Sequence, residues 1–209
     1  MKILVTAGPT REPIDPVRFI SNRSSGKMGY AVAQAGREHG HEVRLVSGPV
    51  ALQPPAGVEL TSVSTADEMR AAVERSLEWC DALVMAAAVA DWRPSRVAAN
   101  KLKKSSSAPR IELEATPDIL KAIASRKGRR LFVGFAAETE RVLDEASRKL
   151  REKNLDLVVA NDVSAPDAGF DVDTNRVTLL SRDGARESLP LLSKHEVADR
   201  IVRWIEAQR

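Results

Sequence analysis

The sequence has a single cysteine, three histidines and no apolar run long enough to cross a membrane. Cys80 alone can form neither an internal disulfide nor a cysteine metal cage, and three scattered histidines argue against a metal site or triad built on imidazole. A net charge of +3, from 32 basic and 29 acidic residues, is too balanced to indicate nucleic-acid binding. Because no signal peptide precedes the first strand-like run, we expect a cytoplasmic protein.

The two common phosphate-binding fingerprints are also missing. A P-loop would need glycine at position 21 and serine or threonine at position 28, where the chain has Ser21 and Met28. A dinucleotide fingerprint would need Gly-x-Gly-x-x-Gly after the first strand, but Gly8 is followed by Pro9 and Thr10. A phosphate site in this chain must therefore be built in another way.

Apolar runs that alternate with helical patterns predict an α/β fold. The expected strands cover 2–7, 42–47, 58–63, 82–88, 111–113, 131–136 and 157–160. The expected helices cover 26–39, 65–79, 117–127, 141–154 and 193–208, with Thr65 and Thr116 as predicted N-caps. This alternation favours a Rossmann-like, doubly wound, mostly parallel sheet, and residues 176–189 read as a C-terminal hairpin. With no repeat and no second domain in the pattern, we predict one domain over residues 1–209.

The polar stretch from residue 15 to residue 29 is the strongest candidate for a site. Hydrogen-bond donors gather in it, and it leads into a helix whose first N–H groups suit an anion. The alternative is an ordinary capped connection, but strand-to-helix connections usually take only about 2–6 residues. Parallel strands end at one edge, so Gly8, Ser47 and Ala88 should converge there. The predicted substrate- or phosphate-binding loop comprises Gly8, Ser24, Ser25, Gly26, Lys27 and Ala88.

A basic segment over about 92–110 follows the most apolar strand. It contains Arg93, Arg96, Lys101, Lys103, Lys104 and Arg110, three consecutive serines at 105–107 and no acidic residue. Such a run is usually only a solvated face. Its length and its position at the functional edge favour a flap over a polyanion.

Taken together, these residues resemble the bacterial phosphopantothenate–cysteine ligases (phosphopantothenoylcysteine synthetases) of coenzyme A biosynthesis. The resemblance covers nearly the whole chain and rests on blocks in the same order: residues 6–10, 15–29, 86–94, 101–104, 116–120, 134–139 and 161–162. It implies CTP-dependent ligation of 4'-phosphopantothenate with L-cysteine through an acyl-cytidylate, with Mg²⁺, releasing CMP and pyrophosphate. No flavin is expected in this domain, although bacterial members are commonly fused behind a flavin-dependent decarboxylase domain.

The resemblance also implies roles for individual residues. Asn22 would hold the acyl-nucleotide, Arg18 would support the same step, and Lys101 would be the flap lysine needed for turnover. The nucleotide-binding positions would be Asp91, Lys101, Pro117, Asp118, Ile119, Leu120, Phe135, Lys149 and Lys153. No protein ligand for the metal is assigned. The family is dimeric, so we expect a homodimer, with the strand edges of the hairpin at 176–189 as the predicted contact.

Two other classes of protein stay open at this point. A Rossmann-type reductase would need the glycine fingerprint and an acidic residue at the end of the second strand, where the chain has Ser47 and Gly48. A non-catalytic phosphoribonucleotide-binding module would explain the predicted crevice but not Arg18, Asn22 and Lys101 together. The fold alone separates none of these classes.

Overall fold

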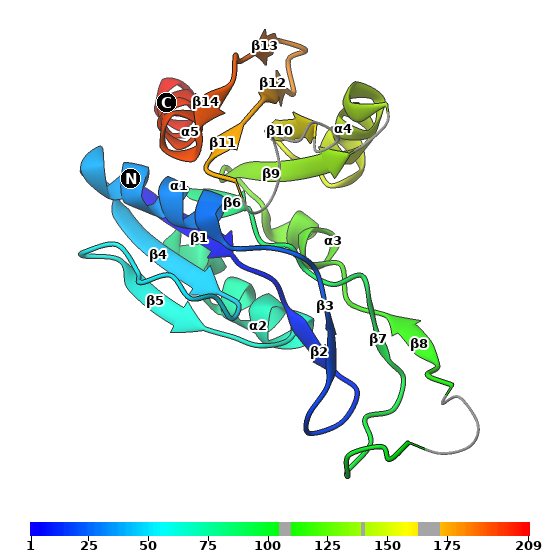
Figure 1. Cartoon of the computed structure of the whole chain (residues 1–209). Coiled ribbons are helices and arrows are strands. Elements are labelled where there is room, and N and C mark those ends of the chain that lie inside the picture. Colours follow the sequence, from blue (N-terminus) through cyan, green and yellow to red (C-terminus); the bar gives the residue numbers. More distant parts are fainter. Residues whose placement is uncertain (105–109, 139–140, 163–171) are drawn as a thin grey trace.

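An eight-stranded sheet forms the centre of the protein, in a computed structural model that describes residues 1–104, 110–138, 141–162 and 172–209 (Figure 1). In spatial order the strands are β13 (Arg186–Ser188), β12 (Val177–Ser181), β10 (Leu157–Asp162), β9 (Leu131–Glu138), β6 (Ala82–Met85), β1 (Lys2–Ala7), β4 (Glu42–Ser47) and β5 (Glu59–Ser62). The strands from β10 to β5 are parallel, and β12 and β13 are antiparallel. Counted along the chain, the parallel strands follow the Rossmann order 3-2-1-4-5-6. The predicted Rossmann-like, mostly parallel sheet with a C-terminal hairpin is confirmed.

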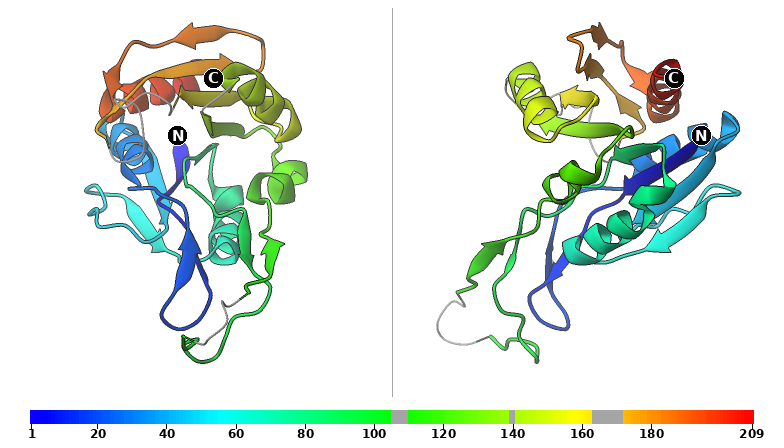
Figure 2. Two further views of the ribbon diagram at one scale, coloured as in Figure 1. Left: turned by 45° about the vertical axis from the view of Figure 1, so that its right-hand side comes forward. Right: turned by 180° about the vertical axis from the view of Figure 1, so that it is seen from behind.

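Helices cover both faces of this sheet (Figures 1 and 2). One face carries α1 (Lys27–Glu38) and α5 (Lys194–Ala207). The other face carries α2 (Ala66–Ser76), α3 (Ile119–Ile123) and α4 (Val142–Glu152), with 3-10 turns η1 (Leu77–Trp79) and η2 (Ala124–Arg126) after α2 and α3. Among the helices that the structure describes, none combines the length and apolar character needed to cross a bilayer.

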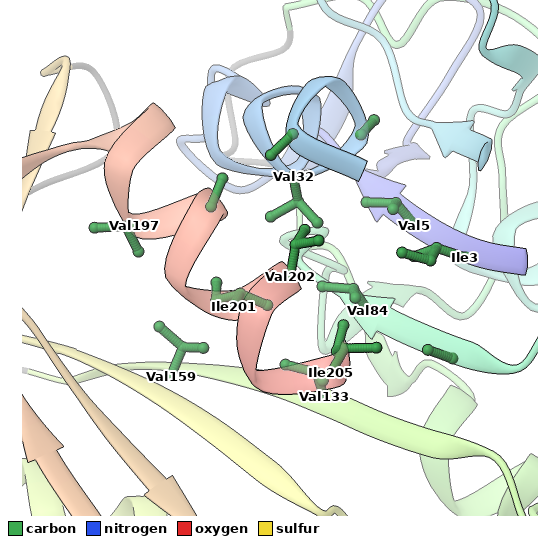
Figure 3. Close-up of a cluster of buried hydrophobic side chains, with 14 of the residues drawn as sticks. Ile3, Val5, Val32, Val84, Val133, Val159, Val197, Ile201, Val202 and Ile205 are labelled. Carbon is green, nitrogen blue, oxygen red and sulfur yellow. The ribbon is translucent and has the colours of Figure 1, made fainter. Parts of the chain in front are cut away.

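The core between the sheet and α1 and α5 fixes the position of α1. Side chains from three parts of the chain meet there without solvent contact: Ile3, Val5, Val84, Val133 and Val159 from the strands, Val32 from α1, and Ile201, Val202 and Ile205 from α5 (Figure 3). Burying each such side chain stabilises the fold by roughly 1.5–3 kcal/mol. The start of α1, at the edge where the strands end, therefore rests on a rigid support.

Two short hairpins were not predicted, and together they project from the sheet (Figures 1 and 2). β2 (Arg11–Pro13) pairs with β3 (Phe19–Ser21), and β7 (Trp92–Pro94) pairs with β8 (Leu113–Ala115). We call residues 11–21, 92–104 and 110–115 the arm. The predicted loop at 15–29 is thus partly a hairpin, the predicted flap begins as a strand, and the strand expected at 111–113 lies two residues later. A further two-stranded pairing, β11 (Thr174–Asn175) with β14 (Leu192–Ser193), was also not predicted.

The helix starts test the predicted caps. Thr65 caps α2 in a full capping box with Glu68, as expected. The cap of α3 is Asp118, whose carboxylate accepts the backbone N–H of Lys121 at 3.1 Å. The prediction of Thr116 is wrong because the Thr116 hydroxyl donates instead to the Ala90 carbonyl at 2.5 Å. As a result α3 begins two residues after the predicted start.

Candidate active site

The candidate site lies at the ends of β1 and β6, where the order of the parallel strands reverses. The Ala88 N–H donates to the Gly8 carbonyl at 2.9 Å, and the Thr10 N–H donates to the Ala88 carbonyl at 3.3 Å. At the end of β4, the Gly48 N–H donates to the Ala7 carbonyl at 2.9 Å. Gly8 and Ala88 therefore converge as predicted, at the switch point where Rossmann folds bind their ligands.

Glycines let α1 begin close against this edge. Gly8 (φ +74°) and Gly26 (φ +78°) are both in the left-handed region, and a Cβ on either would lie within 3.0 Å of Val50 Cγ1. Gly26 precedes α1 without a side-chain cap, and the first turn holds no acidic residue. The first-turn N–H groups and the positive end of the helix dipole together suit an anionic group at this point.

Other residues of the predicted phosphate loop form contacts within the protein. The Ser24 hydroxyl accepts the Gly26 N–H at 3.3 Å, which shapes the turn into α1. The Lys27 ammonium lies 2.6 Å from the Asp173 carboxylate, and one third of its side chain is exposed. Ser25 is half-buried between them. The loop is thus a polar turn that brings one cation beside the start of α1.

Asn22 ties the hairpin β2–β3 to the segment after β6. Its Nδ2 donates to the Val89 carbonyl at 2.9 Å and to the Ala88 carbonyl at 3.3 Å. The two carbonyls fix the direction of the amide, since only the nitrogen can donate to them. Asn22 Oδ1 has no partner among the described residues and is left as an exposed acceptor.

Arg18 is held by a carboxylate that the sequence reasoning overlooked. Asp15 is fully buried at its side chain, and its Oδ2 lies 2.5 Å from Arg18 Nη2. The same Nη2 donates to the Leu102 carbonyl at 2.8 Å, so Arg18 also contacts the predicted flap. The Arg18 guanidinium holds the pKa of the Asp15 carboxyl far below its usual range. The stretch 15–29 is therefore not made of donors alone.

The lysines of the predicted flap are not held by contacts of this kind. Lys101, Lys103 and Lys104 are exposed, and in the part of the chain that the structure describes none of them forms a hydrogen bond or ion pair. Arg93 differs, because it donates to Glu114 at 2.8 Å and also pairs with Asp67. The serines at 105–107 lie outside the described residues. Lys101 is therefore available to a ligand, while Arg93 joins β7 to β8.

The predicted nucleotide-binding residues gather beside α3 and α4. The Lys153 ammonium pairs with the Asp118 carboxylate, and the Lys149 ammonium donates to the Phe135 carbonyl. Burial lowers the pKa of Lys153, and the nearby charge of Asp91 opposes that effect. Ile119 and Leu120 are buried, Pro117 and Phe135 are partly exposed, and Asp91 is exposed. Asp118 and Lys153 thus form an ion pair with Asp91 nearby, and Lys149 is held against the end of β9.

The segment 87–91 joins this group to the Asn22 side of the site. Thr6 and Thr10 accept the N–H groups of Ala87 and Ala90 through their hydroxyls at 3.2 and 3.0 Å. On the far side, the Thr116 N–H donates to the Asp91 carbonyl at 3.0 Å. Sequence reasoning missed these threonine tethers, and only their place inside the motif blocks could have suggested them. These hydrogen bonds fix the segment 87–91 between the two halves of the site.

Strand order and site geometry define a Rossmann-like α/β protein with a candidate anion site at the switch point. The chain belongs to the family described as the DNA/pantothenate metabolism flavoprotein C-terminal domain, whose model matches residues 1–208.

Several curated relatives are similar over nearly the whole chain. The coenzyme A biosynthesis bifunctional protein CoaBC of Bacillus subtilis (strain 168) is 48% identical over 206 residues, 98% of this chain and 51% of that protein. The protein of the same name from Escherichia coli (strain K12) is 45% identical over 217 residues, 100% of this chain and 53% of that protein. The chain thus spans about half the length of these relatives.

Among solved structures, the crystal structure of the C-terminal domain of coenzyme A biosynthesis bifunctional protein CoaBC superimposes with a TM-score of 0.85. It is 47% identical and covers 99% of this chain and 94% of that chain. The fold of this chain is therefore that of the C-terminal half of those bifunctional proteins.

Proposed function

We propose that this chain is a phosphopantothenate–cysteine ligase that uses CTP to join 4'-phosphopantothenate with L-cysteine in coenzyme A biosynthesis. The observation that carries the proposal is the meeting of three features at one switch point. These are the uncapped start of α1, the fixed Asn22 amide and the lysine–carboxylate group around Asp118 and Lys153. The family supports this reading, and Ser47 at the end of β4 disfavours a nicotinamide enzyme. We further propose that the 209 residues act as one ligase unit and work in the cytoplasm.

The reaction needs charge neutralisation and exclusion of water rather than a protein nucleophile. A carboxylate oxygen of phosphopantothenate attacks the α-phosphorus of CTP, and the bond to pyrophosphate breaks. The cysteine nitrogen then attacks the carbonyl carbon of the acyl-cytidylate and CMP leaves. Cys80 suits no nucleophilic role, because it is buried in the core below α2 and burial raises the pKa of its thiol to about 11.

The side chains of the site divide between these two steps. Lys27 and the start of α1 suit a phosphate group, and Lys101 suits the charge that develops on the triphosphate. The free Oδ1 of Asn22 suits an N–H of the attacking amine, because that oxygen accepts and the amide nitrogen is already engaged. Lys149 and Lys153 border the proposed nucleotide position with Asp91 and Asp118.

Mg²⁺ is proposed to enter with CTP. Within the residues that the structure describes, no group of three or more histidine, cysteine, aspartate or glutamate side chains is arranged to hold a metal ion. This fits a magnesium ion bound mainly by phosphate oxygens and water, as is common for nucleotide substrates. When bound, Mg²⁺ would neutralise charge on the phosphates. We assign no protein ligand to it.

The decisive experiment measures product formation with each substrate omitted in turn. CMP and pyrophosphate should appear together with phosphopantothenoylcysteine only when CTP, phosphopantothenate and cysteine are all supplied. ATP in place of CTP should give much slower turnover; equal turnover would overturn the choice of CTP and leave ligation standing. No ligated product with either nucleotide would contradict the proposed function. Stabilisation by NADPH in a thermal-shift assay would point to the reductase reading instead.

We also propose that the chain forms a homodimer through the arm. Among the described residues nine large hydrophobic side chains are exposed, and seven of them are on the arm: Val17, Phe19, Trp92, Val97, Leu102, Ile111 and Leu113. Such a patch is typical of an interaction surface. The hairpin edge that was expected to associate, β13, carries only Arg186, Glu187 and Ser188 and is short and polar.

Sedimentation should therefore give a wild-type mass of about twice 22.8 kDa at micromolar concentration. Changing Ile111 and Leu113 together to aspartate should give monomers, because two buried charges would disrupt an apolar interface. The matched control changes Leu60 and Leu191, the two large exposed hydrophobic residues that the structure describes outside the arm, to aspartate and should leave the dimer intact. A wild-type monomer would contradict the proposal. We also propose a flavin-dependent decarboxylase as a fused domain or separate partner, because the curated relatives are named as bifunctional and the chain spans only about half of their length.

A further inference from the structure

The turn between β2 and β3 contains a buried carboxylate with an unusually complete set of partners. Asp15 accepts five hydrogen bonds although its side chain has no solvent contact. A buried carboxylate is stable only when it is paired and hydrogen-bonded, so each of these contacts matters to the fold of the turn. The proposed ligation steps assign no task to Asp15 itself.

The two oxygens of Asp15 have different partners. Oδ1 accepts the N–H groups of Val17 and Arg18 at 2.8 and 2.9 Å and so closes the local turn. Oδ2 accepts Arg18 Nε at 3.0 Å, Arg18 Nη2 at 2.5 Å and the N–H of Leu102 at 3.1 Å. One oxygen therefore shapes the turn, and the other joins Arg18 to Leu102, which lies 87 residues after Asp15 in the chain.

The turn between β2 and β3 also contacts the segment 92–104 of the arm at a second point. The Ala98 N–H donates to the Ile14 carbonyl at 2.9 Å, independently of the Asp15 side chain. Between Ala98 and Leu102 lies Lys101, whose side chain is exposed. The backbone that carries Lys101 is thus fixed on its C-terminal side by Asp15 and Arg18.

We propose that Asp15 is a positioning residue of the ligase site, which sets the place of Arg18 and, through Leu102, of Lys101. This inference rests on the proposed function, because that function gives Arg18 and Lys101 their tasks. Arg18 suits such an arrangement, since two of its nitrogens are engaged while 44% of its side chain stays exposed. The alternative is that Asp15 only stabilises its own turn.

Asp15→Asn separates these two roles. The Asn carbonyl can replace Oδ1 and keep the turn, whereas its NH₂ group would face the donors of Arg18 and Leu102. Amide exchange measured by NMR should then rise about tenfold at Leu102, which loses a bond to a charged acceptor. Exchange at Ala98 should stay as in the wild type, because its acceptor is a backbone carbonyl. This measurement does not depend on any activity.

Kinetic measurements test whether Asp15 positions the other two residues. We expect kcat/KM for ligation to fall about 10- to 100-fold in Asp15→Asn, as for a misplaced catalytic group. Combined with Lys101→Gln, the loss should be clearly smaller than the product of the two single losses, because both changes act through the same ammonium. Asp183→Asn is the matched control, since Asp183 accepts the Ala185 N–H at 3.0 Å in the turn after β12. It should change neither ligation nor exchange at Leu102.

Several results would overturn the proposal. Wild-type exchange at Leu102 in Asp15→Asn would mean that the contact does not hold the segment. Wild-type kcat/KM, or losses that multiply strictly with those of Lys101→Gln, would reduce Asp15 to a structural role. If the wild-type chain itself shows no CTP-dependent ligation, the proposed function fails and this role fails with it. The exchange result would then still report separately on the Asp15 contact.

Discussion

Asn22→Asp is expected to lower kcat for ligation by about 10²–10³-fold, the usual cost of losing one well-aimed polar group in an active site. The amide nitrogen of Asn22 donates to the carbonyls of Ala88 and Val89. An aspartate would turn a carboxylate oxygen toward both carbonyls, and a negative charge would face the triphosphate. The side chain should therefore leave its position, and the hairpin β2–β3 should lose its hydrogen bonds to the segment 87–91.

Asn22→Ala is the informative companion, because it removes the tether without adding charge. We expect its kcat to fall less than that of Asn22→Asp. Both variants should unfold near the wild-type midpoint, since Asn22 is exposed and surface changes usually alter stability by only about 0.5 kcal/mol. The measurement is single-turnover release of pyrophosphate and CMP, together with thermal unfolding. Wild-type kcat in Asn22→Asp would remove Asn22 from the reaction.

The central strands of the main sheet could be predicted because they are apolar on both faces. Continuous apolar runs such as 82–88 and 131–136 are typical of strands that are buried on both faces, and their alternation with helices predicts a parallel sheet. The strands of the arm gave no such signal. β8 has all three residues exposed, and β3 has none buried. Their pairing depends on contacts distant in sequence, such as the bond from the Arg11 N–H to the Ser64 carbonyl at 2.7 Å.

Around Arg18, the hydrogen-bond donors could be predicted from the sequence and the acceptors that hold them could not. Arg18, Asn22 and Lys101 stand out by type and spacing, whereas the carboxylates that organise them do not. Glu12 is buried and accepts the Ala66 N–H at the start of α2, 54 residues away, at 2.8 Å. Asp15 likewise finds Leu102 only after the arm has formed. A buried acid next to a proline reads as a turn residue until the fold supplies its distant partners.

Gly29→Ala is expected to destabilise the protein although alanine is the better helix former. Gly29 lies in the first turn of α1, where an added Cβ would be 2.5 Å from Ala7 Cβ and 2.8 Å from the Thr6 carbonyl oxygen. These atoms belong to β1 and cannot rotate away. Overpacking of this kind costs about 1–3 kcal/mol or more, which exceeds the helix-propensity gain of about 1 kcal/mol.

Gly36→Ala provides the matched comparison within the same helix. Its Cβ would be 3.0 Å from Val43 Cγ2 and 3.6 Å from Ile3 Cδ1, both of them side-chain methyl groups that can shift. Urea unfolding should show a clear loss of stability in Gly29→Ala and a change within about 1 kcal/mol in Gly36→Ala. Ligation should fall in Gly29→Ala alone, because the start of α1 would be pushed from the edge that carries Gly8. Equal stability of the two variants would mean that α1 can move away from β1 without cost, and the helix start would then be no fixed part of the site.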